Sequence, residues 1–364
     1  MENEKNISRD AGESQREKEL REQMRSLDDE ILTLLVRKLV LRQELTEESM
    51  KQFGDMIAPG TTVYGETGQA SESRSEKILR KYRDALEHRR EPVQDPRVVY
   101  QGEPGAYSEL AAIDFFGEGV RTEGKRTFED AFRALRSGEA DYAVLPIENS
   151  STGAIRQVYD LLVQYECFMV GETTVSVSHS LMALPGVGLE DIDTVYSHEQ
   201  GLFQCERFLE LYPHWRQVAK DDTAGSAKLI AETGNRHAAA ICSARSAKIY
   251  GLHILAEGIN HNSVNTTRFI VVSPQMELRE GSDKICISFT TAHESGSLHE
   301  VLTIFSAYGL NMVRLESRPV LGRNWEYMFF VEFTGSLPEL DDVMEELTHA
   351  TYDMRVFGNF RTNL

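Results

Sequence analysis

Apolar side chains recur at helical spacing between residues 20 and 45, where Leu, Ile and Met return every three or four positions. This period predicts one long amphipathic helix of about seven turns. Residues 53–73 are rich in Gly, Thr and Ser and are typical of a linker. A second, shorter helix is expected over about 74–89, and Pro92 and Pro96 then close the N-terminal part of the chain.

From residue 97 the pattern changes to short β-rich runs that alternate with helical stretches. Strands are predicted at VVYQG, DYAVLPI, DTVYS, AAAICS and RFIVVS, and helices between them at YSELAAIDFF and HEQGLFQCERFLELY. Such alternation is typical of a sheet covered by helices. We therefore expect an α/β domain over residues 97–275, with ligand sites where its strands end.

A smaller pattern occupies residues 283–360. Strands are predicted at KICISFTTA, LNMVRLESR, EYMFFVEFTG and MRVFGNF, and helices at SLHEVLTIFSAYG and PELDDVMEELTHA. The resulting order βαββαβ is that of a ferredoxin-like α+β unit. The chain of 364 residues is thus expected to be multidomain, with a disordered tail at 1–15 and a helical segment at 16–92 before the α/β domain.

The composition limits the kinds of binding partner and the cellular compartment that can be expected for this protein. The formal net charge of −19 argues against a nucleic-acid partner, because phosphate backbones require clustered Lys and Arg. Four separated cysteines without a CxxC pair favour free thiols in a reducing cytosol. The first twenty residues lack the apolar stretch of a signal peptide, and no run reaches the roughly 18 apolar residues of a membrane span. We expect a cytoplasmic protein that does not enter a membrane.

Five polar motifs lie at predicted strand ends of the α/β domain. Alone, each is compatible with an ordinary turn or helix cap. GEPGAYS offers backbone N–H groups at the start of a helix, which suits a carboxylate. The motifs are GEPGAYS at 102–108, PIENSSTG at 146–153, YSHEQGLFQC at 196–205, KDDTAGSAK at 220–228 and NTTRF at 265–269. Their combination in one domain points to a shared site.

In this order the motifs resemble the prephenate dehydratases, and the domain order resembles the bifunctional chorismate mutase–prephenate dehydratases. The similarity runs from about Val98 to Phe360 and includes the specific signature Thr267, Arg268 and Phe269. It implies a two-lobed domain like that of periplasmic binding proteins. It also implies a lyase reaction, the decarboxylative dehydration of prephenate to phenylpyruvate in phenylalanine biosynthesis. Aromatisation of the ring supplies the driving force, so the resemblance implies no cofactor and no metal.

The resemblance also assigns roles to single residues. Thr267 would help the ring hydroxyl leave by donating a proton or a strong hydrogen bond. Neutral donors would hold the departing carboxylate without stabilising the ground state as a tight salt bridge does. The implied catalytic residues are Thr267, Arg268, Glu148 and Asn149, and the implied substrate-binding residues are Ser150, Ser197, Gln204, Asp221 and Thr223.

Two positions depart from the family pattern. Glu199 stands where proline is usual, and Asp222 stands where serine is usual. A carboxylate facing a dianionic substrate would repel it. We therefore expect Glu199 to be exposed in the first turn of a helix, where the helix dipole favours acids, and Asp222 to cap a helix.

Residues 283–360 resemble an ACT domain, an amino-acid-sensing module. The implied sensing positions for L-phenylalanine are Gly296, Ser297, Leu298, Asn311, Glu316, Ser317, Arg318 and Pro319. Alternatively, the ESRP run only ends a strand at a subunit interface. Because such domains pair across a two-fold axis, a homodimer or homotetramer is expected. Inhibition would require a coupling of roughly 1–3 kcal/mol between the two sites.

The run LREQMRSLDDEILTLLVRK resembles the first helix of the chorismate mutases. Arg21 matches the first substrate-binding arginine of that family, and the next falls on Lys38. Of the cluster expected on the second helix, only Arg74 and Glu76 are suggested, and Pro96 leaves no room for a third helix. A mutase needs a nearly complete cationic cage. We therefore favour a degenerate segment retained for assembly over an active mutase in a bifunctional enzyme.

Two further alternatives stay open. Two-lobed α/β clefts also serve solute-binding proteins, so the chain could be a non-catalytic ligand sensor. Arogenate could replace prephenate as the substrate.

Overall fold

The computed structural model describes residues 37, 73–262, 264–320, 323, 325–337 and 340–362. Arg21, Lys38 and nearly all of the helix expected at 20–45 therefore lie outside the described residues. Within the described part of the chain, no helix is long and apolar enough to cross a membrane.

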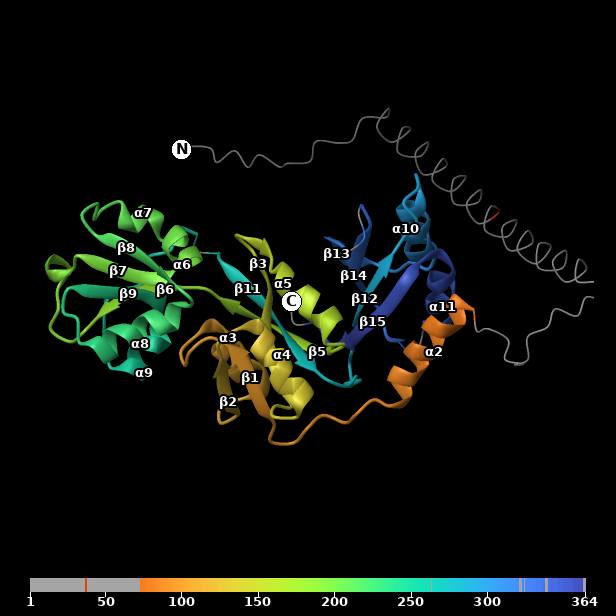
Figure 1. Ribbon diagram of the computed structural model, residues 1–364, viewed down its shortest axis with the longest axis horizontal. Helices are drawn as coiled ribbons and strands as arrows, with labels where there is room; N and C mark the ends of the chain where they lie inside the picture. Colours follow the sequence, from red (N-terminus) through yellow and green to blue (C-terminus); the bar gives the residue numbers. More distant parts are fainter. Residues whose placement is uncertain are drawn as a thin grey trace, which may run out of the picture. The chain divides into compact units, whose positions relative to one another are not determined.

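The first lobe of the α/β region is built on one mixed sheet with the strand order β2-β1-β3-β11-β5 (Figure 1). The first three strands are parallel, whereas β11 runs antiparallel between β3 and β5. Its strands are β1 (Arg97–Gln101), β2 (Arg121–Lys125), β3 (Tyr142–Asn149), β4 (Gly153–Ala154), β5 (Phe168–Ser176) and β11 (Thr266–Ser273). Its helices are α3 (Tyr107–Phe116), α4 (Phe128–Ser137) and α5 (Arg156–Gln164).

The second lobe, green in Figure 1, has a sheet of its own with the order β10-β6-β9-β7-β8. Its strands are β6 (His179–Ala183), β7 (Thr194–His198), β8 (Arg216–Lys220), β9 (Ala238–Ser243) and β10 (His253–Ala256). Its helices are α6 (Glu199–Gln204), α7 (Glu206–Leu209), α8 (Thr223–Thr233) and α9 (Ala244–Tyr250), with a 3-10 turn at Leu189–Asp191. The chain crosses between the lobes twice, from β5 to β6 and from β10 to β11. The predicted α/β architecture is confirmed.

The structure differs from the sequence prediction at one helix and at six strands of the α/β region that were not predicted, namely β2, β4, β5, β6, β8 and β10. Strands β2 and β8 were not predicted because they lie at sheet edges and carry exposed polar residues where a core strand has apolar ones. The single helix expected over 198–212 is broken at Cys205 into α6 and α7. The carbonyl of Gln204 accepts a hydrogen bond from the backbone N–H of His261 at 2.8 Å, outside the helix.

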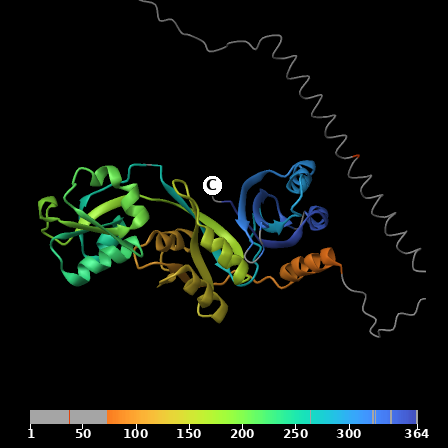
Figure 2. The same ribbon diagram turned by 45° about the horizontal axis from the view of Figure 1, so that its top comes forward.

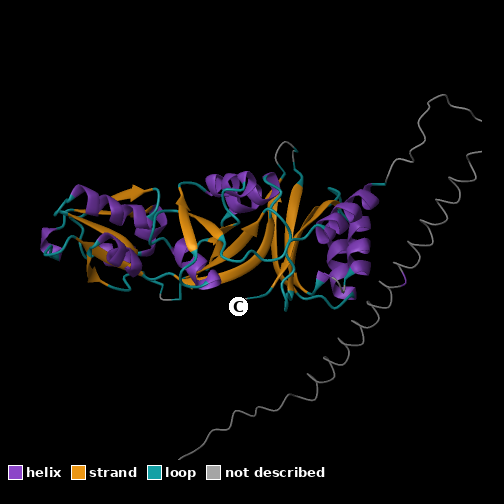
Figure 3. Cartoon of the chain, turned by 90° about the horizontal axis from the view of Figure 1, so that it is seen from below, coloured by secondary structure: helices purple, strands orange, loops and turns teal. Residues whose placement is uncertain are grey.

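The C-terminal unit follows the predicted order βαββαβ. Its elements are β12 (Lys284–Thr290), α10 (Ser297–Ala307), β13 (Met312–Pro319), β14 (Tyr327–Thr334), α11 (Asp341–Ala350) and β15 (Tyr352–Phe360). All pairings in its sheet are antiparallel, in the order β13-β14-β12-β15. Figure 3 shows the helices of this unit gathered on one side of its strands.

Both faces of the C-terminal sheet are covered. On the helical face, Ile287 and Phe333 belong to a core shared with α10 and α11. On the opposite face, Phe330 and Phe357 join the core of the first lobe. The sheet is therefore packed directly against the α/β region as well as against its own helices.

Helix α2 (Arg74–Glu87) confirms the helix expected over about 74–89, but it packs against the C-terminal unit (Figure 2). Its buried side chains Ile78 and Tyr82 enter the core formed by α10, α11 and the sheet. The guanidinium carbon of Arg74 lies 3.7 Å from the ring centroid of Tyr352. The sequence interpretation grouped this helix with residues 16–92. Its apolar face explains the difference, because burying Ile78 and Tyr82 requires the neighbouring core.

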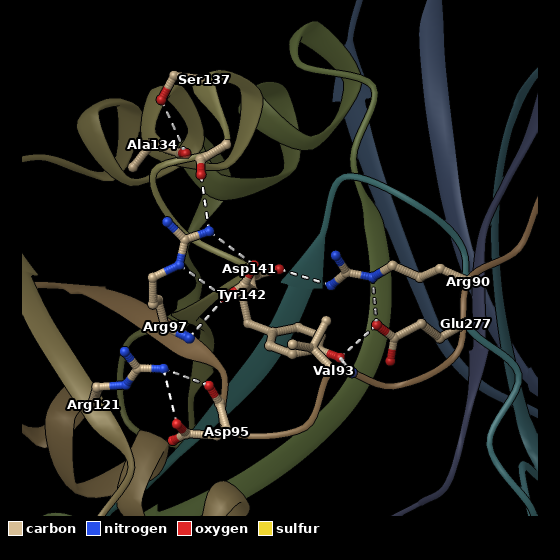
Figure 4. A network of polar contacts seen from close by, with 11 residues as sticks. Arg90, Val93, Asp95, Arg97, Arg121, Ala134, Ser137, Asp141, Tyr142 and Glu277 are labelled. Atoms are coloured by element: carbon tan, nitrogen blue, oxygen red, sulfur yellow. Dashed lines mark hydrogen bonds and ion pairs between the residues drawn. The ribbon is translucent and has the colours of Figure 1, made fainter.

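The segment after α2 is held against the first lobe by a polar network centred on Glu277 (Figure 4). Arg90 donates to Glu277 at 2.9 Å and to the carbonyl of Asp141 at 2.8 Å. The hydroxyl of Tyr142 donates to the same carboxylate at 2.6 Å. Because the Glu277 side chain is fully buried, these donors are needed to offset its desolvation.

Candidate active site

A large cavity is lined by residues from both lobes of the α/β region, and all five sequence motifs contribute to it. Each motif follows or starts a strand, so the strand ends bring them together as open α/β sheets do. Representative lining residues, one from each motif in chain order, are Tyr107, Asn149, Gln204, Thr223 and Thr267.

Strand alternation divides the four expected catalytic residues into two pairs on opposite faces of the sheet. Thr267 lies opposite Asn149 across β11 and β3, and Arg268 lies opposite Glu148. Neighbouring residues of a strand point to opposite faces. Thr267 and Asn149 line the cavity. Arg268 and Glu148 face the C-terminal sheet, where they contact each other and other charged side chains.

The hydroxyl of Thr267 is oriented by Asn149. The Asn149 Nδ2 donates to Thr267 Oγ1 at 2.9 Å. The Asn149 Oδ1 accepts the backbone N–H groups of Ser151 and Thr152 at 2.9 and 3.1 Å, which fixes the orientation of the amide. A hydroxyl has one proton to give. Since Thr267 accepts from Asn149, its own proton remains for a molecule in the cavity.

The hydrogen bonds continue from Asn149 into the second lobe. Asn149 Nδ2 also donates to Asn265 Oδ1 at 2.7 Å, and Asn265 Nδ2 donates to Gln204 Oε1 at 3.0 Å. The same oxygen lies 2.9 Å from His179 Nε2. Because Gln204 Oε1 only accepts, the ring proton of neutral His179 is assigned to Nε2. Nδ1 then faces the hydroxyl of Tyr107 at 3.2 Å.

Sequence reasoning missed Asn265, His179 and Tyr107 as members of this array. Asn265 opens the NTTRF motif and Tyr107 lies in GEPGAYS, so both were within quoted motifs. His179 begins β6, a strand in which every residue is buried, directly after the chain enters the second lobe. A histidine in a fully buried run was the available signal, since buried polar groups need partners.

His179 predicts a pH dependence of stability. Burial lowers the pKa of His179 from its ordinary value of 6.5, opposed by the hydrogen bond with Gln204. The folded state therefore prefers the neutral ring. The contribution of His179 to the free energy of unfolding is fully present above pH 6.5, the pKa of histidine in the unfolded chain. This contribution is lost as pH falls through the lower pKa of the folded state.

Melting temperatures measured between pH 8 and 5 should therefore fall more steeply for the wild type than for His179→Gln. The exposed His253 offers the control variant His253→Gln, whose profile should match the wild type. Parallel profiles for the wild type and His179→Gln would contradict the assignment.

The expected substrate-binding residues separate into two groups. Gln204, Asp221 and Thr223 line the cavity. Ser197 is fully buried, and its hydroxyl donates to the carbonyl of Ile241 at 2.7 Å. Ser150 is exposed, and its hydroxyl accepts the backbone N–H of Thr266 at 3.0 Å. Ser197 and Ser150 are absent from the cavity lining.

The two unusual acids adopt the expected structural positions. Asp222 is the N-cap of α8 and accepts the backbone N–H of Gly225 at 2.6 Å. Glu199 is exposed in the first turn of α6. Both nevertheless also line the cavity. Burial raises the pKa of Asp222, although the bond from Gly225 acts in the opposite direction.

Two cationic residues of the cavity were not anticipated. Lys220 ends β8 and Arg126 follows β2, so both lie at the carboxyl ends of parallel strands. Both line the cavity and can attract the carboxylates of an anionic ligand. In the described part of the chain, no group of three or more His, Cys, Asp or Glu side chains could hold a metal ion.

The expected sensing residues lie in two places of the C-terminal unit. Gly296 precedes α10 with a φ of 92°, a conformation that favours glycine, and Ser297 and Leu298 start the helix. Along β13, Ser317 and Pro319 are exposed, while Glu316 and Arg318, at the alternating positions, are half-buried. Arg318 donates to Asp160 of α5 at 2.6 Å. Before β13, the carbonyl of Asn311 accepts the N–H of Thr334 at 2.9 Å.

Comparisons with known proteins identify the family. Residues 98–277 match the prephenate dehydratase family. The bifunctional chorismate mutase/prephenate dehydratase of Escherichia coli K12 is 36% identical over 72% of this chain and 70% of its own length. This chain belongs to the prephenate dehydratase family. The arogenate dehydratase/prephenate dehydratase 6 of Arabidopsis thaliana is 40% identical over 72% of this chain and 68% of its own length. The chain thus spans about two thirds of the length of these relatives.

Solved structures agree with the family assignment. Prephenate dehydratase from Arthrobacter aurescens in complex with L-Phe is similar, with a TM-score of 0.66 and 30% identity over 73% of this chain and 90% of that one. A protein described as a quorum quenching acylase, GqqA, has a TM-score of 0.67 and 29% identity over 73% of this chain and 98% of that one. The fold of the prephenate dehydratase family therefore occurs in proteins described by different activities, so the chemistry must be argued from the site.

Proposed function

We propose that this protein catalyses the dehydration and decarboxylation of prephenate to phenylpyruvate. The observation that carries the proposal is the Thr267 hydroxyl in the cavity, which accepts a hydrogen bond from Asn149 at 2.9 Å and keeps its own proton available. The family to which the chain belongs supports the same reaction.

In the proposed reaction, the prephenate dianion takes up one proton and yields the phenylpyruvate anion, CO₂ and water. The bond between the ring and its carboxylate breaks, and its electrons enter the ring as the C4–O bond breaks. Thr267 donates its proton to the leaving C4 oxygen, which departs as water, and the threonine oxygen regains a proton from solvent, the one proton taken up overall. Such positioned acid catalysis contributes roughly 10²–10⁴-fold.

Lys220 and Arg126 are proposed to hold the side-chain carboxylate of the substrate, since both cations line the cavity. The departing ring carboxylate is better served by neutral donors such as Gln204 and Thr223, because a tight salt bridge would stabilise the ground state. Gln204 Oε1 is already engaged by Asn265 and His179, so its amide NH₂ is the group left for a ligand.

The C-terminal unit is proposed to be an ACT domain that binds L-phenylalanine and inhibits the dehydratase. Its βαββαβ order and the L-Phe complex of the Arthrobacter aurescens relative support this proposal. A homodimer or homotetramer and a cytoplasmic location are part of the same proposal. The four cysteines, all buried free thiols, are compatible with a reducing compartment.

The N-terminal segment is proposed to be a degenerate mutase. Arg74 and Glu76, the two residues that suggested the second mutase helix, have other partners. Arg74 stacks on Tyr352, and Glu76 forms a capping box with Ser73. Their engagement supports a role for α2 in packing rather than in a cationic cage.

Arogenate is a second candidate substrate, favoured by the acids in the cavity. Arogenate carries an ammonium group where prephenate carries a keto group, and Glu199, Asp221 and Asp222 offer carboxylates there. The Arabidopsis relative is named for both activities. The carboxylate of Asp222 would attract the ammonium group of arogenate, whereas it would make no favourable contact with the dianionic prephenate.

Assays of the purified protein with prephenate, arogenate and chorismate, each with and without phenylalanine, test these proposals. We expect phenylpyruvate from prephenate, suppressed by phenylalanine, and no turnover of chorismate. Chorismate consumption would instead make the enzyme bifunctional. Tight binding of these ligands without turnover would favour a sensor over an enzyme.

Asp222→Ser separates the two substrates, because serine also caps helices. If Asp222 binds the ammonium group, the KM for arogenate rises about tenfold, equivalent to about 1.4 kcal/mol, while the KM for prephenate does not rise. An equal change for both substrates would rule out this role.

A further inference from the structure

Arg268 joins the strand that carries Thr267 to the C-terminal sheet. Its Nη1 and Nη2 donate to the two carboxylate oxygens of Glu332 at 2.7 and 2.8 Å. Nη1 also donates to Glu172 of β5 at 2.9 Å. Since Glu332 belongs to β14, the two-pronged pair connects the first lobe directly with the C-terminal unit.

The pair lies within a larger group of charged side chains on this face of β11. Lys284 of β12 donates to Glu172 at 2.6 Å and lies 3.8 Å from Glu332. Glu148 lies 3.6 Å from Arg268 and also contacts Arg314 of β13. The group holds three cations and three carboxylates, so its charges balance: Arg268, Lys284, Arg314, Glu148, Glu172 and Glu332.

Both members of the central pair remain charged although they are buried. Burial acts to lower the pKa of Arg268, but Glu332 and Glu172 act together in the opposite direction and the net shift is upward. Burial acts to raise the pKa of Glu332, but Arg268, Lys284 and Arg314 together hold it below its ordinary value. Charge-assisted, two-pronged bonds of this kind fix orientation as well as distance.

We propose that Arg268 is a positioning residue, which sets the place of Thr267 in the cavity by fastening β11 to Glu332 of the C-terminal sheet. This proposal rests on the proposed function of Thr267. The two residues are adjacent in the strand, so a shift of Arg268 moves the backbone of Thr267. A misplacement of about 1 Å at a catalytic group can cost roughly 10²-fold in rate.

The same pair offers a route by which the C-terminal unit controls the cavity. Strand β14 pairs with β13, which carries the expected sensing residues Glu316 to Pro319. A ligand-dependent movement of these strands would pull on Arg268 through Glu332. Among the described residues, Tyr159 Oη and Arg314 Nε are buried without a hydrogen-bond partner, so polar groups at this junction could rearrange.

The double variant Arg268→Met with Glu332→Met tests the proposal. It removes one cation and one carboxylate, and it leaves Lys284 and Glu172 paired, so folding should be retained. We expect kcat to fall at least tenfold, KM to change less than about threefold, and inhibition by phenylalanine to disappear. Activity is to be measured per folded protein, with the melting temperature recorded for each variant.

Asp160→Asn is the matched control, because the Asp160–Arg318 pair also joins the first lobe to the C-terminal sheet but has no bond to β11. Its kcat should equal that of the wild type. Arg268→Lys keeps the positive charge but cannot form the two-pronged hydrogen bonds of the guanidinium group, and it should give an intermediate kcat. If the double variant does not fold, Glu332→Gln, which keeps the shape of the side chain, serves in its place. The expectation is the same, a lowered kcat with a KM that changes little.

A wild-type kcat in the folded double variant, or equal losses in the double variant and Asp160→Asn, would overturn the positioning role. Wild-type protein that turns over neither prephenate nor arogenate would instead overturn the proposed function. The two failures are therefore distinguishable.

Discussion

Thr267→Val is expected to lower kcat for prephenate by roughly 10²–10⁴-fold, the usual contribution of positioned acid catalysis. Valine has nearly the shape of threonine but no hydroxyl, so the C4 oxygen loses its donor. Thr267 is buried at 8% exposure between β3 and β5, and the variant should keep the fold. Steady-state kinetics with prephenate, and arogenate in parallel, measure the effect.

Thr267→Ser supplies the matched control, because it keeps the hydroxyl and should retain most of the rate. Phenylalanine binding, measured by calorimetry, should be unchanged in Thr267→Val, since the expected sensing residues belong to another unit. A Thr267→Val enzyme with most of its turnover would remove Thr267 from the mechanism.

Asn149→Asp is expected to lower kcat by about 10²-fold or more, the cost of losing one oriented donor in an active site. The carboxylate can still accept the backbone N–H groups of Ser151 and Thr152, so the local turn should persist. It cannot donate to Thr267 Oγ1, however, and would instead accept the hydroxyl proton of Thr267. The proton needed by the substrate would then be held by the protein.

A double-mutant cycle with Thr267→Val tests whether Asn149 acts through Thr267. In the valine background, Asn149→Asp should have little further effect on kcat. Independent, multiplying effects of the two substitutions would show that Asn149 acts on the substrate by another route.

The outlines of the fold could be predicted because its main signals are local. The α3 helix and the core strands β1, β3, β7, β9 and β11 are short runs rich in buried residues. Strands β2 and β8 escaped prediction because they carry polar residues like those of loops. Strands β5 and β6 also escaped prediction, although most of their residues are buried. The position of α2 escaped prediction too, since its apolar face does not reveal which core receives it.

The candidate site was predictable as a set of motifs but not as a geometry. Glu148 with Asn149, and Thr267 with Arg268, are sequence neighbours that a motif treats as one group. Pairing of β3 with β11 sends one member of each pair into the cavity and the other toward the C-terminal sheet. Glu332 and Lys284, in contrast, lie in strands outside every motif quoted for the α/β site.

By itself, then, the sequence determined the order of helices and strands, the residues gathered at strand ends and the family resemblance. These follow from periodicity and from motifs read along the chain. Only the tertiary structure decided which side of β11 each residue faces, that His179 and Asn265 complete the array around Thr267, and that Arg268 meets Glu332. Such contacts join residues up to 118 positions apart, as for Asn149 and Thr267. They depend on strand register and domain packing, which no local pattern encodes.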